Sequence, residues 1–188
     1  MVCNDNPYSL VLNPNPLSIL NFDNTKEHVI ELNSLSKAFN MAGWRVGMVL
    51  GHEDYINAIL RVKSNVDSGM FLPVQHAAVH ALNHPDTWHN ERNEVYQERK
   101  GIVTEILETV GCSVSGTQVG MFVWGKLQDD SMEVRDIVDN LLHNAHVFVT
   151  PGEIFGSNGE RYLRMSLCAK KEVFEEALSR VKLWKSKK

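Results

Sequence analysis

The sequence predicts an α/β fold whose C-terminal part is an α+β lobe. Short apolar strands are expected at 29–32 and 45–50, a run of helices follows, and strands return in alternation with helices after Gly111. Strands and helices that alternate along a chain are typical of layered folds in which helices cover a sheet. With 188 residues, the chain is long enough for one ordinary domain or two small ones.

Three helices are predicted in the middle of the chain. In residues 53–66 the apolar side chains recur at the spacing of one helix face, and a second helix is expected over 73–83. A long third helix is expected over 86–110. Asp86 can cap its N-terminus, and Gly111 is the residue type that commonly ends a helix.

After the long helix, the predicted elements change from successive helices to strands that alternate with helices. Here we expect, in order, strands 112–115 and 121–127, helix 131–144, strands 146–149 and 162–167, and helix 170–186. The expected domain boundary therefore lies inside the long helix and divides the chain into residues 1–95 and 96–188.

Composition excludes several classes of partner. The net charge of −4 and the pI near 6.1 give no reason to expect nucleic acid or an anionic membrane surface. Cys3, Cys112 and Cys168 show neither metal-site spacing nor a disulfide framework, which fits a reducing cytoplasm. The sequence has no long apolar run and no basic leader, so we expect a cytoplasmic protein without a membrane span or signal peptide.

The chemistry is concentrated in residues 34–47, which read Ser-Leu-Ser-Lys-Ala-Phe-Asn-Met-Ala-Gly-Trp-Arg-Val-Gly. Lys37 follows the end of a predicted strand, where α/β sheets bind ligands, and a desolvated lysine there can form a Schiff base. Arg45 and the hydroxyls of Ser34 and Ser36 can hold a phosphate. The alternative is a solvated Lys–Arg pair beside a buried strand, but the order of small and polar residues favours a ligand site.

This order resembles the cofactor-attachment motif of class I/II aminotransferases, the aspartate-aminotransferase type of fold type I. In that motif Ser-x-Ser/Ala-Lys is followed by a small or polar residue, Gly, and Arg-x-Gly. The resemblance implies that Lys37 forms a Schiff base with pyridoxal 5′-phosphate (PLP) and moves protons between the substrate α-carbon and the cofactor. It also implies that Ser34 and Arg45 bind the phosphate, with Ser36 a further ligand or a neighbour of one.

The segment Asn4-Asp5-Asn6-Pro7-Tyr8 resembles the Asp-x-x-Tyr of the same family. The resemblance implies that Asp5 pairs with the pyridinium nitrogen of PLP and keeps it protonated, which makes the ring an electron sink. Tyr8 would donate to the phenolic oxygen. The alternative is an Asx-turn followed by proline, a common use of such residues.

Near the C-terminus, an arginine in a predicted strand resembles the family residue that grips the substrate α-carboxylate. Arg164 fits best, with Arg161 as the competitor, and an arginine on a solvated strand face as the alternative. The preceding Pro151-Gly-x-x-Phe155-Gly156 also resembles a loop of the family.

Two other features give weaker indications of function. His76, His80 and His84 recur at helical spacing, but no further ligand lies in register, so a solvated or interface face is favoured over a metal site. Residues 64–69 resemble a stretch that lies near the partner subunit's cofactor in the family, which hints at a homodimer.

Family members are about twice as long as this chain, so the resemblance implies the C-terminal part of a PLP-dependent transferase fold. Residues 1–95 would belong to the large PLP-binding domain and residues 96–188 would form the small domain. The implied parent enzyme transfers an amino group between an amino acid and a 2-oxo acid, and the piece alone is expected to bind PLP poorly and to be inactive. The rivals are a PLP-dependent C–S lyase and a non-catalytic PLP-fold module for sensing or dimerisation.

Overall fold

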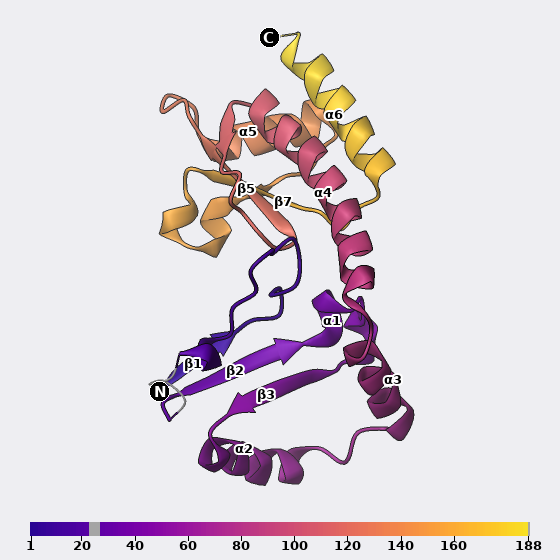
Figure 1. Cartoon of the computed structure of the whole chain (residues 1–188). Coiled ribbons are helices and arrows are strands. Elements are labelled where there is room, and N and C mark those ends of the chain that lie inside the picture. The colour runs from indigo at the N-terminus through magenta and orange to yellow at the C-terminus, as the bar shows by residue number, and fades with distance from the viewer. Residues whose placement is uncertain (23–26, 188) are drawn as a thin grey trace. The chain divides into compact units, whose positions relative to one another are not determined.

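The computed structural model describes residues 1–22 and 27–187. The chain divides into two compact units, Met1–Asn90 (unit 1) and Glu91–Lys188 (unit 2), each described here by itself. The division falls within the long helix α4, Asp86–Thr109 (Figure 1). No described helix is long and apolar enough to cross a membrane.

Unit 1 is built on a mixed sheet of strand order β1-β2-β3. Strand β2, Val29–Ser34, lies in the middle and begins with three buried residues, as expected of a strand covered on both faces. Strand β1, Val2–Asp5, runs parallel to it, and β3, Gly47–Gly51, runs antiparallel (Figure 1). Because β1 is parallel to β2 and β3 is antiparallel to it, the carboxyl ends of β1 and β2 lie at the same end of the sheet as the amino end of β3.

The helices of unit 1 begin where the sequence offers a suitable first turn. The His52 ring nitrogen accepts from the Asp54 amide at 3.3 Å and caps α2, Glu53–Val66. Helix α3, Leu72–Leu82, has a proline in its first turn, where the missing N–H costs nothing. The shorter elements are η1 (Ile19–Asn21), α1 (Leu35–Ala38) and η2 (Ala42–Trp44).

The hydrophobic cluster beneath residues 35–46 of unit 1 is small. Leu35, Met41 and Val46 are buried together, and side chains of α3 pack against them. Leu35 is 1% exposed, so the apolar first residue of α1 holds this short helix against the rest of the unit. The partly buried residues of the cluster are Phe39, Met48, Val74, Ala77, Ala78 and Ala81.

Unit 2 is an antiparallel sheet with helices, which fits the predicted α+β lobe. The strand order is β4-β5-β7-β6. The elements that follow α4 are β4 (Cys112–Val114), β5 (Phe122–Leu127), α5 (Val134–Asn140), the π-helical η3 (Leu141–Ala145), β6 (Thr150–Pro151), η4 (Gly152–Phe155), η5 (Ser157–Gly159), β7 (Tyr162–Ser166) and α6 (Lys171–Lys185).

The core of unit 2 forms where the alternating strand residues meet the apolar side of α4. Val103, Ile106 and Leu107 of α4 are fully buried, as is Leu163 of β7. A glycine lets the sheet approach the helix closely, because a Cβ at Gly125 would lie 2.9 Å from Cys112 Cβ and 3.3 Å from Leu107 Cβ.

The predicted strand at 146–149 is wrong. His146 has φ 55° and ends the π-helical turn η3 in a left-handed conformation, so the chain reverses where a strand was expected. Strand pairing begins only at Thr150, opposite Arg164.

The strand predicted at 45–50 and the helix predicted at 131–144 both begin later than expected. Arg45 has φ 55° and lies before β3, which starts at Gly47. The Asp129 carboxylate accepts from the amide and the hydroxyl of Ser131, a local turn that delays the helix to Val134.

Candidate functional site

The residues singled out in the N-terminal half of the chain gather at one edge of the unit 1 sheet. Asp5 ends β1 opposite Leu32, and Ser34 ends β2 opposite Gly47, the first residue of β3. The parallel pair β1 and β2 therefore ends at the edge where the antiparallel strand β3 begins (Figure 1). A sheet edge formed by the carboxyl ends of parallel strands is a common ligand-binding position.

Lys37 lies in α1, one turn beyond the end of β2, and its side chain is half-buried. The helix starts because the Ser34 hydroxyl accepts a hydrogen bond from the Ser36 amide at 3.1 Å. The same hydroxyl donates to the Val46 carbonyl at 3.3 Å, which ties α1 to the start of the next strand. No hydrogen bond or ion pair of the Lys37 ammonium occurs within residues 1–22 and 27–187, so its amine is available for chemistry.

Arg45 reaches the same edge from the other direction. It is exposed, has the left-handed φ of 55°, and follows η2, whose Ala42 carbonyl accepts from Arg45 Nη1 at 3.0 Å. A guanidinium has five N–H donors, so this bond leaves donors for an anion. Gly47 is needed two residues later, because a Cβ there would lie 2.9 Å from the Asn33 carbonyl oxygen.

Asp5 and Tyr8 lie at the end of β1 and in the turn that follows it. Asp5 is exposed, and Tyr8 is half-buried in a turn closed by a 3.0 Å hydrogen bond from the Val11 amide to the Tyr8 carbonyl. The Asn6 amide donates to the Leu32 carbonyl at 2.8 Å and so continues the pairing with β2 beyond Asp5.

One buried group beside this edge was missed by the sequence analysis. Glu31 of β2 is 4% exposed and accepts hydrogen bonds from Asn6, Ser18 and Ile19. A carboxylate inside the apolar run Val29-Ile30-Glu31-Leu32 was the available signal, because strands buried on both faces seldom carry a charge.

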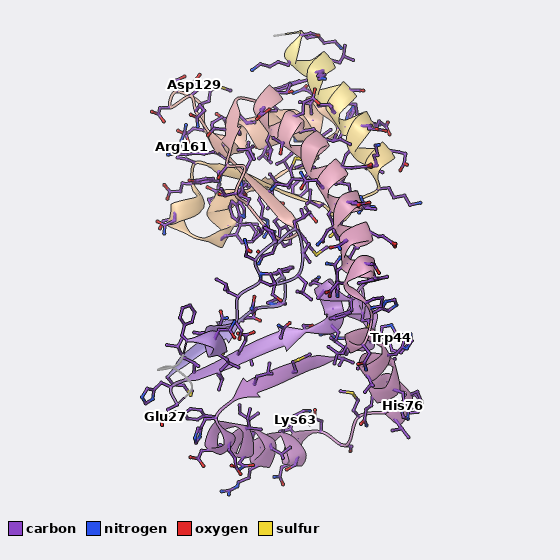
Figure 2. All side chains as sticks on the ribbon, viewed as in Figure 1. Glu27, Trp44, Lys63, His76, Asp129 and Arg161 are labelled. Carbon is purple, nitrogen blue, oxygen red and sulfur yellow. The ribbon has the colours of Figure 1, made fainter. Side chains whose placement is uncertain are left out.

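The two candidate arginines of unit 2 have different environments. Arg161 donates to the carbonyls of Met132 (2.7 Å) and Asp129 (2.6 Å), so it anchors the loop before α5 (Figure 2 labels Arg161 and Asp129). Arg164 is half-buried in β7 with its guanidinium over aromatic rings, 3.8 Å from the centroid of Phe155 and 4.3 Å from that of Phe122. Stacking on aromatic rings orients the planar guanidinium.

The three histidines of the stripe lie in α3 and just beyond its end. His80 and His84 approach each other with ring centroids 5.8 Å apart, and His76 lies on α3 (Figure 2). In the described parts of the chain no group of three or more His, Cys, Asp or Glu residues is arranged to hold a metal ion.

The donors at the unit 1 edge fit an aromatic, phosphorylated aldehyde. An amine that can form a covalent bond lies with a carboxylate, a phenol, hydroxyls and a guanidinium on adjoining strand ends. A carboxylate suits a protonated ring nitrogen, and a guanidinium suits a phosphate. This set of groups is compatible with a lysine-linked, phosphorylated cofactor.

The chain belongs to the family described as aminotransferase class I and II, which it matches over residues 5–181. Members of this family use PLP. The sequence is 39% identical over 183 residues to the LL-diaminopimelate aminotransferase of Natranaerobius thermophilus and 38% identical over 184 residues to that of Aquifex aeolicus. These matches cover 96% and 97% of this chain and 47% of each relative, so the chain spans about half the length of the curated relatives it matches.

Solved structures give the same picture of the fold. Substrate-bound BacF from Bacillus subtilis matches with a TM-score of 0.86 and 35% identity, over 96% of this chain and 47% of that one. A probable N-succinyldiaminopimelate aminotransferase from Thermus thermophilus also matches with a TM-score of 0.86, at 32% identity over 97% of this chain and 49% of that one. The α/β fold expected from the sequence is confirmed as a partial PLP-dependent transferase fold.

Proposed function

We propose that this chain is part of a PLP-dependent aminotransferase that moves an amino group between an amino acid and a 2-oxo acid. The observation that carries the proposal is the position of Lys37. It lies one turn beyond the end of β2, at the sheet edge where Asp5, Ser34 and Arg45 also lie. Membership of the aminotransferase family supports the same reaction.

In this proposal each residue has a separate task. The Lys37 amine would hold the cofactor and would carry the proton removed from the substrate α-carbon. PLP, when bound, supplies the electron sink for that proton transfer. Asp5 holds the proton on the ring nitrogen, and Tyr8 donates to the phenolic oxygen. Arg45 and Ser34 bind the phosphate, with Ser36 beside them.

The substrate part of the proposal rests on unit 2 and on the relatives. Arg164, oriented by Phe155 and Phe122, would bind the α-carboxylate. The curated relatives are named LL-diaminopimelate aminotransferases, so LL-diaminopimelate is the first amino donor to test.

A homodimer is part of the proposal. The end of α2, the start of α3 and the segment between them expose large apolar side chains, which is unusual for a free surface. These residues are Leu60, Val62, Val66, Met70, Phe71 and Leu72.

The covalent step can be tested with the complete product of the gene, purified with PLP. We expect an absorbance band near the visible edge. Borohydride should remove this band by reducing the Schiff base, and peptide mapping should then find the cofactor covalently attached to Lys37. Lys37→Ala and Lys37→Arg should both lose the band, while Lys63→Ala, an exposed lysine of α2, should keep it. A band retained by Lys37→Arg would show that another lysine carries the cofactor.

The reaction type has its own test. Aminotransfer predicts that each 2-oxo acid formed from the donor is matched by one new amino acid formed from the acceptor. Release of ammonia or of a thiol without an amino product would identify a lyase instead. A normal band without turnover of any amino acid would favour a non-catalytic PLP-fold module.

A further inference from the structure

Glu31 is a carboxylate buried in the middle strand of the unit 1 sheet. It lies in β2 with 4% of its surface exposed, between Ile30 and Leu32. Burying an ionised carboxylate without hydrogen-bond partners is strongly unfavourable, so a residue kept in this position must be compensated by donors.

Several hydrogen-bond donors compensate the two oxygens of Glu31. Oε2 accepts from the Ser18 hydroxyl at 2.7 Å and from the Ile19 amide at 2.9 Å, and Oε1 accepts from Asn6 Nδ2 at 3.3 Å. Burial raises the pKa of the Glu31 carboxyl, but the hydrogen bonds from Ser18, Ile19, Asn6 and Asn4 outweigh it and hold the pKa below its ordinary value. Glu31 is therefore ionised at neutral pH.

Most of these donors come from the two ends of one excursion of the chain. Asn6 directly follows Asp5 at the end of β1, and Ser18 caps η1 at the end of the excursion. Asn6 Nδ2 also donates to the Leu17 carbonyl at 3.1 Å, so the two ends are joined to each other as well as to Glu31. The segment 6–19, which contains Tyr8, is closed into a loop over β2.

We propose that Glu31 is a positioning residue for the cofactor edge. By holding Asn6 and Ser18, it fixes the direction in which the chain leaves β1 and thereby the positions of Asp5 and Tyr8. The inference rests on the proposed function, because it assigns Glu31 a role toward the ring that Asp5 and Tyr8 would bind. Glu31 itself does not contact the cofactor in this proposal, and it acts only through Asp5 and Tyr8.

A carboxylate is required for this role because an amide cannot replace it. Glu31→Gln keeps the size of the side chain but leaves one accepting oxygen for the same donors. Whichever way the amide turns, its NH2 group faces the N–H of Asn6 or of Ile19. The variant should open one end of the loop without creating a cavity.

The test compares Glu31→Gln and Asn6→Ala in the complete product of the gene, with two controls. Glu53→Gln removes an exposed carboxylate from the first turn of α2, and Val29→Ala truncates a buried apolar side chain of the same strand that makes no hydrogen bond to Glu31. Hydrogen exchange of the amides of residues 5–20 reports the loop directly. Both test variants should speed this exchange about tenfold and raise the dissociation constant for PLP about tenfold.

The spectroscopic readout separates positioning from stability. With Asp5 displaced, the ring nitrogen loses its proton more easily and no longer repels the proton on the Lys37 linkage. The pH midpoint of the absorbance band should therefore move upward in Glu31→Gln and Asn6→Ala, but not in Val29→Ala, whose loss of stability is unrelated to Asp5.

The outcomes distinguish this inference from the proposed function. The positioning role alone is overturned if the wild type has a normal band and Glu31→Gln leaves its pH midpoint unchanged. It is also overturned if Glu31→Gln leaves the hydrogen exchange of residues 5–20 unchanged. A wild-type protein without any Lys37-dependent band overturns the proposed function and this inference together.

Discussion

Arg45 is the residue that we propose as the main phosphate ligand. Its left-handed backbone and its bond to the Ala42 carbonyl orient the guanidinium at the edge where β3 begins. Arg45→Ala should weaken PLP binding about tenfold to a hundredfold, the value of one charge-assisted hydrogen-bond pair. Pyridoxal, which lacks the phosphate, should bind both proteins equally.

Arg180→Ala, at an exposed arginine of α6, is the matched control for this Arg45 prediction and should bind PLP like the wild type. The measurement is a titration of the absorbance band with each compound. An equal loss for PLP and pyridoxal would place Arg45 away from the phosphate.

The three cysteines differ in reactivity because they differ in burial. Cys3 and Cys168 are exposed, whereas burial of Cys112 raises the pKa of its thiol to about 12. Only the thiolate reacts with disulfide reagents, so at pH 8 the folded protein should titrate two thiols quickly and the third only after denaturant is added. Replacing Cys112 by Ala should leave the fast phase unchanged. Fast reaction of Cys112 in the folded protein would mean that β4 opens readily.

At the scale of elements, two glycines should respond in opposite directions to alanine. A Cβ at Gly152 would lie 2.4 Å from the Gly159 carbonyl oxygen, so Gly152→Ala forces η4 and η5 apart and should cost about 1–3 kcal/mol of unfolding free energy. Gly101 lies inside α4 with nothing within 4 Å of an added Cβ, so Gly101→Ala should stabilise by about 0.5–1 kcal/mol. Urea unfolding of the two variants measures both, and a stabilised Gly152→Ala would contradict the close packing of this loop.

How far the elements could be predicted depended on how local their causes are. The helix predicted at 53–66 has those bounds in the structure, because its apolar spacing and its cap lie within the segment itself. Helix α1 has only four residues, so no periodicity could reveal it. The false strand at 146–149 is an apolar run whose first residue, His146, is left-handed, a conformation that depends on the preceding π-helical turn.

The residues of the candidate site also differ in how far they could be predicted, depending on whether their partners are near or distant in the sequence. Lys37 and Arg45 belong to one short motif and could be singled out from the sequence alone. Glu31 could not, because its partners Asn6 and Ser18 are 25 and 13 residues away and meet it only when β1 pairs with β2. Arg164 was preferred over Arg161 from the sequence, but the different environments of the two side chains could not be predicted, because the carbonyls of Met132 and Asp129 that bind Arg161 lie about 30 residues away.

At the scale of the whole molecule, the buried apolar side chains are unevenly shared. Most of those in the described residues belong to unit 2, where α4, the sheet and α6 enclose a core that includes Val103, Leu163 and Val181. Unit 1 has a small cluster around Leu35 and exposes large side chains between α2 and α3, such as Phe71 at 72%. Since buried apolar area dominates folding stability, unit 2 should be the more stable of the two.

This difference predicts two unfolding transitions in urea for the 188-residue chain, with unit 1 unfolding first. The tryptophans allow each transition to be followed by fluorescence, because Trp44 and Trp88 lie in unit 1 while Trp124 and Trp184 lie in unit 2. The double variant with Phe at 44 and 88 reports unit 2 alone, and the one with Phe at 124 and 184 reports unit 1.

The midpoint reported from unit 2 should lie at the higher urea concentration, and a fragment of residues 91–188 should reproduce it. Because the 188-residue piece is expected to bind PLP poorly, PLP should have to be added in large excess to shift a midpoint, and it should then raise only that of unit 1, to which Lys37, Arg45 and Asp5 belong. Coincident midpoints in the two double variants, shifted together by PLP, would instead mean that the whole chain unfolds as one cooperative body.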